Sequence, residues 1–373
     1  MAQEREKRRI VIASILKPVD DTRMLDKMGV SLASTGDWDV SIIAYQSTVI
    51  TSNRGIQLIP LRKFRRLSFG RWLARWKVLL EAWKCKPTLF IFNTHELLIP
   101  ALVLKVTRNS MIIYDVRENF YLNIRHSESL PPLFRFPLAL LVRFKEKLLA
   151  PAIDHYFLAE KGYEHEFKFH RGGWTVVENK AFIDPKVQER KKEPGKLRLL
   201  FSGTLAESTG VFRAIQLAKS LFALNKNTSL TIIGYASTEI VRRRIRDESK
   251  SCSFIHVIGL DHLVPHQQIA ELIQQSDAGI LSYPFSELTR NSVPSKLFEY
   301  LHCRLPIILE RGWPWIDRYS SFHPFLFVDF VNPDHQTLLN ALLHNEFYLT
   351  HPTDVGWESE APGFLQIIKK LMV

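Results

Sequence analysis

One stretch of the sequence places a proline, a lysine and a glutamate where they could bind phosphate and sugar hydroxyl groups. In NSVPSKLFEYLHCRLPIILE, Pro294 could begin a helix at its first turn, with Ser292 or Val293 near the N-cap. The free backbone N–H groups of a first turn suit a diphosphate, and Lys296 adds a positive charge there. Glu299 lies on nearly the same helical face, where it could accept hydrogen bonds from two ribose hydroxyls. The alternative is an ordinary solvated ion pair between Lys296 and Glu299.

A second stretch, LLFSGTLAESTGVFRAIQLAKSL, has the pattern of a strand, a glycine turn and a helix. The strand ends in Ser202-Gly203-Thr204, and Gly210 precedes the helix. A glycine lets the backbone approach a phosphate closely. The same features also occur in a generic strand-turn-helix unit, so this stretch alone does not establish a binding site.

Charged side chains follow the apolar run MIIYDV in the first half of the chain. Asp115 and Glu118 are candidate general bases for a hydroxyl group, and simple helix capping is the alternative. Arg117 keeps its charge at all relevant pH values, so it cannot shuttle a proton but can hold a phosphate or carboxylate.

Two other apolar runs of the first half end in polar residues of the same kind. Asp21 and Arg23 follow the first run and are expected on the acceptor side of a cleft between two domains, although they could be a capping aspartate and a surface arginine. His95 follows TLFIFN and is a weaker candidate, because a lone histidine is more often structural.

The elements that position these residues alternate between short β-branched runs and amphipathic stretches. This alternation predicts two successive doubly wound parallel sheets, an α/β architecture in which ligands bind outside the carboxyl ends of the strands. A charged segment with Pro185, Pro194 and Gly195 is the best linker candidate. The expected strands are 10–16, 40–45, 88–93, 111–116, 155–160 and 174–179 in the first half, and 197–203, 230–235, 254–260, 278–283, 306–309 and 325–330 in the second.

Composition limits the class of protein. At 373 residues, with 46% hydrophobic and 24% charged residues, the chain is expected to form two globular domains. Three cysteines without metal-binding spacing favour a reducing, cytoplasmic setting and argue against a zinc site. No transmembrane span is expected, because LFRFPLALLVRF is interrupted by Arg135 and Arg143.

The net charge of +12 is concentrated in the first half. Residues 62–86 combine many basic residues with Trp72, Trp76 and Trp83 at helical spacing. This segment could lie on an anionic membrane surface, or its tryptophans could fill the domain core. Nucleic acid is not an expected partner, since no nucleic-acid-binding signature accompanies the charge.

Three of these stretches together resemble the retaining glycosyltransferases of family 4. PSKLFEYLHCRLPII is similar to the family's Pro-x-Lys-x-x-Glu-Tyr helix with its following turn and strand, and LLFSGTLAESTG to its Gly-x-Leu-x-x-x-Lys-Gly element. ASILKPVDDTRMLDKMG resembles a subgroup with an Asp-x-Arg first loop. The chain departs from the pattern at Asn291, Thr209 and Arg117, where relatives have glutamate, lysine and histidine.

The resemblance implies a GT-B fold, in which two Rossmann-like domains face each other across a cleft. The domains would be 1–185, which binds the acceptor, and 197–373, which binds the donor, joined by a linker at 186–196, with the last helix, about 357–373, packing back on the first domain. It implies donor contacts from Gly203, Thr204, Gly259, Leu260, Ser292, Pro294, Lys296 and Glu299, and a sugar-facing role for Asn291.

The activity implied by the resemblance is transfer of a sugar from a UDP- or GDP-sugar to a hydroxyl group of a glycan or lipid-linked acceptor. Neither a cofactor nor a metal is expected. Surface polysaccharide or glycolipid assembly, with the enzyme peripheral at the inner face of the cell membrane, is the expected setting. Two alternatives remain open: a sugar-nucleotide epimerase of the same fold, and a non-catalytic subunit that binds nucleotide sugar or membrane.

Overall fold

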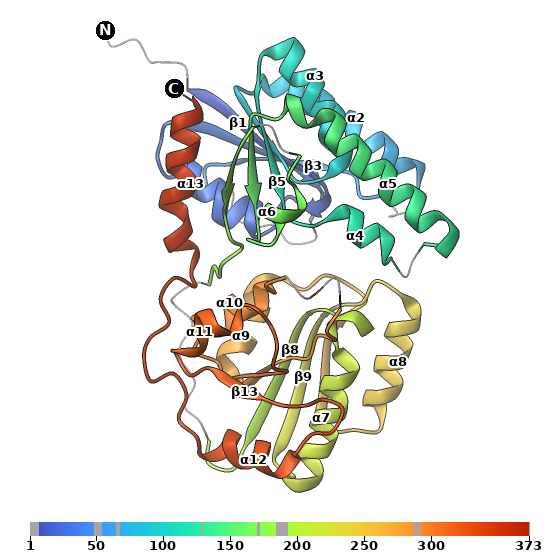
Figure 1. The fold of residues 1–373 in the computed structure, drawn as a ribbon, viewed down its shortest axis with the longest axis vertical. Coiled ribbons are helices and arrows are strands. Elements are labelled where there is room, and N and C mark those ends of the chain that lie inside the picture. The colour runs from blue at the N-terminus through green and yellow to red at the C-terminus, as the bar shows by residue number, and fades with distance from the viewer. Residues whose placement is uncertain are drawn as a thin grey trace. The chain divides into compact units, whose positions relative to one another are not determined.

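The computed structural model describes residues 7–47, 54–64, 68–127, 130–169, 172–183, 193–286, 289 and 292–372. The chain forms two compact units, each a sheet covered by helices (Figure 1). Unit 1 comprises Met1–Asn179 and Trp357–Val373, and unit 2 comprises Lys180–Gly356. Most of the expected linker, 186–196, lies outside the described residues.

Unit 1 is built on a seven-stranded parallel sheet of order β3-β2-β1-β4-β5-β6-β7. Its central strands are buried on both faces, which explains their nearly continuous runs of apolar residues. The strands are β1 (Arg8–Pro18), β2 (Trp38–Tyr45), β3 (Gln57–Leu61), β4 (Leu89–Phe92), β5 (Met111–Val116), β6 (His155–Leu158) and β7 (Gly173–Val176).

The helices of unit 1 connect these strands on both faces of the sheet (Figure 1). The final helix also belongs to this unit: Trp357 donates a hydrogen bond to Ser31 (2.9 Å), and the ring of Phe364 packs 5.5 Å from that of Phe157. The helices are η1 (Arg23–Gly29), α1 (Val30–Ala33), α2 (Phe69–Cys85), η2 (His95–Leu97), α3 (Leu98–Arg108), α4 (Phe120–Arg125), α5 (Pro132–Leu149), η3 (Ala150–Ala152), α6 (Tyr163–Glu166) and α13 (Trp357–Met372).

Strand β3 has no counterpart among the strands expected from the sequence. Its sequence, QLIPL, is short and contains Pro60, which cannot donate a hydrogen bond to a neighbouring strand. The structure places it at the edge of the sheet beside β2, where such a proline is tolerated. A proline within a short apolar run is therefore compatible with an edge strand.

Unit 2 repeats the architecture with a six-stranded parallel sheet of order β10-β9-β8-β11-β12-β13. The two sheets confirm the expected α/β class with two Rossmann-like domains. The strands are β8 (Leu197–Thr204), β9 (Thr228–Tyr235), β10 (Ile255–Leu260), β11 (Ala278–Leu281), β12 (Ile307–Leu309) and β13 (Phe325–Phe327). The helices are η4 (Glu207–Thr209), α7 (Val211–Leu224), α8 (Glu239–Lys250), α9 (His266–Gln275), α10 (Ser295–His302), α11 (Ile316–Ser320) and α12 (His335–His344).

In both sheets the strand order reverses beside the first strand of the unit, between β1 and β4 and between β8 and β11. Ligands of doubly wound sheets bind at such reversals, outside the carboxyl ends of the strands. The loops that follow β1, β4 and β5 in unit 1, and β8 and β11 in unit 2, are therefore the places to search for a site.

Candidate functional site

Three glycines lie side by side at the carboxyl edge of the unit 2 sheet. Gly203 pairs with Gly234 across β8 and β9, and Gly234 pairs with Gly259 across β9 and β10. All three have positive φ angles, of 101°, 153° and 88°. A Cβ atom on Gly234 would lie 1.7 Å from the carbonyl oxygen of Gly203, and one on Gly259 would lie 2.4 Å from that of Gly234. A Cβ atom would clash at each of these positions, so the glycines let the backbone and side chains of neighbouring elements approach this edge closely.

The side chain of Lys296 crosses this glycine edge. A Cβ atom on Gly203 would lie 2.3 Å from Cε of Lys296, so the glycine is required for the lysine to pass. The Lys296 ammonium lies 4.9 Å from the ring centre of Phe201 and 5.4 Å from that of Tyr283. Lys296 is only 8% exposed, and within the described part of the chain it makes no hydrogen bond or ion pair. A buried ammonium held only by aromatic rings is well placed to bind an anion.

Helix α10 begins at Ser295, one residue later than the sequence suggested. Pro294 is the N-cap residue and has extended backbone angles (φ −65°, ψ 133°), so it precedes the helix and does not form part of its first turn. Ser292 lies before it, and its carbonyl oxygen accepts a hydrogen bond from the indole N–H of Trp315 (3.1 Å). This bond fixes the loop that leads into α10. Asn291 lies outside the described residues.

A pocket opens beside this loop. It is small and partly open to solvent, and it is lined by Leu281, Tyr283, Thr289, Ser292, Pro294, Trp313 and Trp315. The rings of Trp313 and Trp315 stack with their centres 6.0 Å apart. An apolar pocket with aromatic walls next to a few polar groups is typical of small-molecule sites. Neither tryptophan was predicted from the sequence, although their position just after β12 is where a parallel sheet places ligand-binding residues.

The alternative interpretation of the sequence, an ion pair between Lys296 and Glu299, is not what the structure shows. The carboxylate oxygen Oε1 of Glu299 lies 2.9 Å from Nε2 of His266, the first residue of α9. The Glu299 side chain is 15% exposed, so a ligand hydroxyl could reach it and compete with the imidazole. Lys296 and Glu299 thus remain separate, one over the glycine edge and the other beside α9.

The turn after β8 supplies no cation of its own. The hydroxyl of Thr209 donates to the carbonyl oxygens of Thr204 (2.8 Å) and Ala206 (2.9 Å), so it holds the turn together. The nearby cation Arg213, in the first turn of α7, forms an ion pair with Glu310 (3.1 Å).

The last predicted donor contact, Leu260, lies next to Gly259 at the end of β10. It is buried and has a φ angle of 65°.

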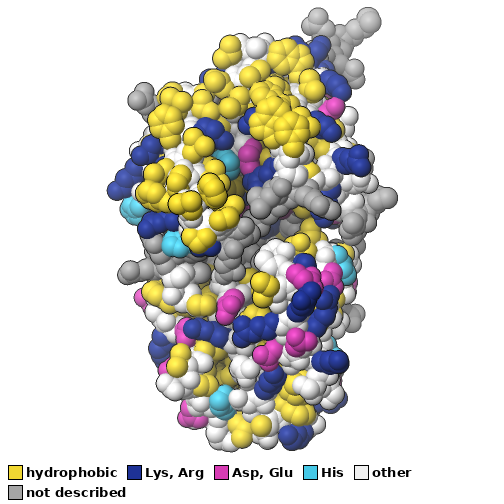
Figure 2. All heavy atoms as spheres, turned by 90° about the vertical axis from the view of Figure 1, so that its right-hand side faces the viewer, with side chains coloured by type: hydrophobic (Ala, Val, Ile, Leu, Met, Phe, Trp, Pro, Cys, Tyr) yellow, Lys and Arg dark blue, Asp and Glu magenta, His cyan; other side chains and the backbone are white. Residues whose placement is uncertain are grey.

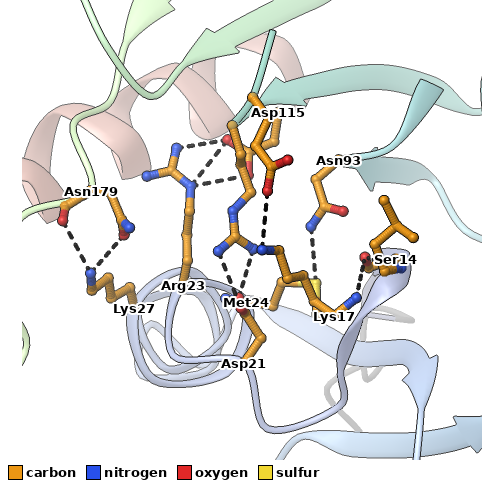
Figure 3. A network of polar contacts seen from close by, with 12 residues as sticks. Ser14, Lys17, Asp21, Arg23, Met24, Lys27, Asn93, Asp115 and Asn179 are labelled. Atoms are coloured by element: carbon orange, nitrogen blue, oxygen red, sulfur yellow. Dashed lines mark hydrogen bonds and ion pairs between the residues drawn. The ribbon is translucent and has the colours of Figure 1, made fainter. Parts of the chain in front are cut away.

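In unit 1 the two Asp-x-Arg triplets of the chain pair with each other (Figure 3). Arg23 donates to both carboxylate oxygens of Asp115, with its shortest contact at 2.6 Å, and also to the carbonyl oxygen of Val177 (3.0 Å). Arg117 in turn donates to both oxygens of Asp21, at 2.7 and 3.1 Å. The candidates after β1 and those after β5 therefore lie together in one reciprocal network.

The two ion pairs differ in exposure. The Arg23 and Asp115 side chains are 0% and 2% exposed, and those of Arg117 and Asp21 are 12% and 13% exposed. Burial alone would raise the pKa of Asp21, but the guanidinium of Arg117 outweighs it and lowers that pKa to about 2. The Asp21–Arg117 pair is therefore ionised at neutral pH. The Asp115 carboxylate is buried against Arg23 and is not open to an incoming ligand.

Glu118 is the most exposed carboxylate of this group. Its side chain is 38% exposed and lies 3.2 Å from the ammonium of Lys17, which the sequence reasoning had not selected. Asn123 also donates to Glu118 (3.1 Å). Of the two general-base candidates after β5, Glu118 is the one that solvent, and hence a hydroxyl group, can reach.

His95 is held in a separate cluster after β4. Its Nδ1 lies 3.0 Å from the ammonium of Lys145, and its Nε2 lies 3.4 Å from the carboxylate of Glu96. Burial lowers the pKa of His95 to about 4. Burial also lowers the pKa of Lys145 to about 8. The imidazole is therefore neutral at neutral pH, with Nδ1 accepting from the ammonium.

We expect the stability of unit 1 to depend on His95 between pH 6.5 and pH 4. In this window the unfolded histidine, with its ordinary pKa near 6.5, binds a proton that the folded one resists, so the free energy of unfolding falls as pH falls. The total loss is on the order of 3 kcal/mol. The free energy of unfolding of the wild type and that of His95→Gln, each measured as a function of pH, should therefore converge toward pH 4. The other titrating groups are the same in both proteins, so their contributions cancel in the difference between the two free energies. A difference that does not change with pH would contradict a buried, neutral His95.

Solved structures of other proteins are similar to nearly the whole length of this chain. Sucrose-phosphate synthase from Thermosynechococcus elongatus superposes with a TM-score of 0.66 at 14% identity, covering 98% of this chain and 99% of that one. A UDP-forming trehalose-phosphate synthase from Burkholderia xenovorans, in complex with glucose-6-phosphate, gives 0.64 at 10% identity, covering 97% and 100%. The chain has the GT-B fold. No protein-family model and no curated protein sequence matches it.

A protein described as a UDP-N-acetylglucosamine 2-epimerase from Listeria monocytogenes has the same GT-B fold. It superposes with a TM-score of 0.61 at 12% identity, covering 98% of this chain and 96% of that one. Transferases and epimerases thus share this architecture, and the likeness identifies the fold alone. The choice between the two activities depends on the residues of the site.

Within the described residues, no group of three histidine, cysteine, aspartate or glutamate side chains is arranged to hold a metal ion. An Asp-x-Asp triplet, a pattern that can hold Mg²⁺ against a diphosphate, does occur at Asp37-Trp38-Asp39. It lies at the amino end of β2, where Asp37 faces Lys369 at 3.9 Å. The candidate residues lie at the opposite, carboxyl edge, and metal-independent chemistry stays a prediction.

Proposed function

We propose that the protein is a glycosyltransferase that moves a sugar from a UDP- or GDP-sugar to a hydroxyl group. The observation that carries the proposal is Lys296, whose buried ammonium lies against two aromatic rings and the backbone of Gly203, with no anionic partner among the described residues. Burying an unpaired charge is costly, and a donor diphosphate would supply the missing negative charge.

The proposed donor site lies along the carboxyl edge of unit 2. The diphosphate would approach the backbone at Gly203 and Thr204, while Lys296 and the first turn of α10 offset its charge. Glu299 would exchange its contact with His266 for the ribose hydroxyls. The nucleobase would pack near Gly259 and Leu260, and the loop of Ser292 and Pro294 would close over the phosphates.

The proposed acceptor side uses unit 1 with a division of roles among its charged residues. Glu118 would contact the acceptor hydroxyl, because it is the accessible carboxylate. Asp115 and Arg23 would position the loops after β1 and β5, since both are buried in their mutual ion pair. Arg117 is neutralised by Asp21, so it would orient this loop and be less available to hold a phosphate than the sequence suggested. His95 would support the acceptor side from its cluster.

In this proposal the sugar is transferred with retention at the anomeric carbon and without a metal ion. Lys296 and the α10 N-terminus would stabilise the charge that develops on the leaving diphosphate. Assembly of a surface polysaccharide or glycolipid on the cytoplasmic side of the membrane, with a glycan or lipid-linked acceptor, is the setting we propose. Asn291 would contact the sugar as an uncharged amide.

Glu299→Ala is expected to lower kcat/KM for the donor by about 10- to 100-fold, because the ribose loses its hydrogen bonds to a carboxylate. His266→Ala is the matched control: it removes the group that competes for the same oxygen, so donor affinity should be unchanged or higher. The measurement is initial rate against donor concentration for both variants. Equal losses in the two variants would mean that the His266–Glu299 contact is structural, and would contradict the ribose assignment.

The epimerase alternative is favoured by one neighbour of the same fold. Incubation of the purified protein with nucleotide sugar alone separates the two activities. A glycosyltransferase leaves the donor intact or releases nucleoside diphosphate and free sugar by slow hydrolysis. An epimerised sugar nucleotide in the product would overturn the transferase proposal. Absence of transfer with any acceptor, together with retained nucleotide binding, would favour the non-catalytic subunit.

A further inference from the structure

Helix α5 of unit 1 has its apolar side chains on the outside. Its buried positions include Glu146, and the charged Arg143 and Lys145 are partly buried as well. In contrast, a continuous set of large apolar side chains faces solvent, which is the reverse of an ordinary surface helix. These exposed side chains are Leu133 (80%), Phe134 (60%), Phe136 (54%), Leu138 (38%), Leu140 (46%), Leu141 (61%), Phe144 (62%) and Leu148 (63%).

The inside charges of α5 are satisfied within unit 1, so the inversion is built into the fold. Glu146 accepts a hydrogen bond from the hydroxyl of Tyr114 (3.1 Å) and lies 3.2 Å from Arg143. Arg143 also donates to the side chain of Asn119 (2.8 Å) and lies over the rings of Phe167 and Phe169. Turning the helix over would move Arg143 and Glu146 to solvent and leave the buried hydroxyl of Tyr114 without its hydrogen bond to Glu146.

The exposed apolar surface continues onto the neighbouring helices. Helix α3 packs against both α2 and α5, so the three form one layer on a face of unit 1 (Figure 1). The large apolar side chains that α2 and α3 expose are Phe69 (70%), Trp72 (46%), Leu73 (38%), Leu80 (61%) and Val106 (75%). Figure 2 views this side of the molecule and shows the hydrophobic side chains gathered on it, with lysine and arginine among them.

The charge around this surface is predominantly positive. Helices α2, α3 and α5 are described in full, and their acidic residues are Glu81 and Glu146. Glu146 is buried, and Glu81 pairs with Lys84 at 2.7 Å. Lys77, Lys84 and Lys147 are exposed on these helices, and Arg62 and Lys63 precede α2. An apolar face with a basic margin is complementary to an anionic lipid surface.

We propose that the α2–α3–α5 face docks unit 1 on an anionic bilayer, with the outer side chains of α5 entering the headgroup boundary. No helix among the described residues is long and apolar enough to cross a membrane, and α5 contains Pro137 and several charged residues. It therefore lies on the bilayer and does not span it. Residues 62–86 alone were the expected contact; the structure assigns the larger part to α5. The proposal is independent of the proposed activity.

Binding of the full chain to lipid vesicles tests the docking. The wild type should co-sediment with vesicles of 70% phosphatidylcholine and 30% phosphatidylglycerol at least tenfold more strongly than with pure phosphatidylcholine vesicles. The double variant Leu141→Glu/Phe144→Glu should lose at least tenfold in affinity for the anionic vesicles. Both side chains are exposed, so the fold should be kept, which circular dichroism melting checks. A second variant, Lys77→Gln/Lys84→Gln/Lys147→Gln, should lose binding in proportion to its lost charge.

The matched control is Leu224→Glu/Ile240→Glu, which changes two exposed apolar side chains of unit 2 and should bind vesicles as the wild type does. Failure of the wild type to bind anionic vesicles would overturn the proposal. So would binding that the α5 variant leaves unchanged, or an equal loss in the control. Concentration-dependent dimerisation abolished by the α5 variant, without vesicle binding, would assign this face to a second copy of the chain and would also overturn it.

Discussion

Lys296→Met is expected to lower kcat/KM for the nucleotide-sugar donor by about 100-fold, the effect of removing a charge-assisted contact to phosphate in a buried site. Methionine keeps the apolar stem that lies over Gly203 and beside Phe201, so the fold of unit 2 should be preserved. If the ammonium contacts the diphosphate in both ground state and transition state, most of the loss appears in donor affinity. Initial rates over a range of donor concentrations give kcat and KM for the donor separately.

Lys226→Met is the matched control for this experiment. Its ammonium also lies over an aromatic ring, that of Phe222 at 4.6 Å, but it precedes β9 at the amino end of the sheet. The control should leave kcat/KM unchanged. Gly203→Ala should reproduce the Lys296→Met loss, because its Cβ would displace the lysine. A Lys296→Met enzyme with wild-type donor kinetics would contradict the assigned phosphate contact.

Arg23→Met should destabilise unit 1 by roughly 3–5 kcal/mol, because it leaves the carboxylate of Asp115 buried without a partner. The double variant Arg23→Met/Asp115→Leu should recover much of this loss, since both charges are then removed. Because the chain has two units, a single unfolding transition cannot be assumed. Hydrogen exchange of peptides from β1 and β5 measures the stability of unit 1, and peptides from β8 serve as an internal reference.

A surface ion pair of the same unit provides the comparison. Arg54 and Asp26 lie 3.7 Å apart, with the arginine side chain 48% exposed, and Arg54→Met should cost at most about 1 kcal/mol. A loss for Arg23→Met no larger than this would mean that the Arg23–Asp115 pair is not the structural link between the β1 and β5 loops. If Arg23→Met/Asp115→Leu is as unstable as Arg23→Met, the lost stability would come instead from the contact of Arg23 with Val177.

Much of the fold could be predicted from the sequence because buried parallel strands have a strong local signal. Runs such as RIVIAS and LRLLFSG are apolar on both faces, and each coincides with a strand. The two sheets followed from their alternation with helices. The edge strand β3 was missed, since its pattern is short and its proline is tolerated only at the edge of the sheet, a position that local sequence does not reveal.

The part of the candidate site formed by helix α10 and the turn after β8 could be predicted from the sequence. Lys296, Glu299 and Gly203 carry signals in their own segments, although their contacts with Phe201, Tyr283 and His266 come from other elements. The reciprocal pairing of the Asp-x-Arg triplets joins residues about ninety positions apart, and nothing local to either triplet indicates it. Likewise, the outward apolar face of α5 depends on which of its sides meets the sheet.

A thermal-shift panel of the wild-type protein with nucleoside diphosphates and their sugars tests the central claim, that unit 2 binds a donor diphosphate through Lys296. A ligand present at 100 times its Kd stabilises the folded state by about 2.7 kcal/mol, enough to raise the Tm by several degrees. We expect such a shift with the diphosphates of one base, UDP or GDP, a smaller one with the monophosphate, and none in Lys296→Met. No shift with any nucleotide would contradict the claim.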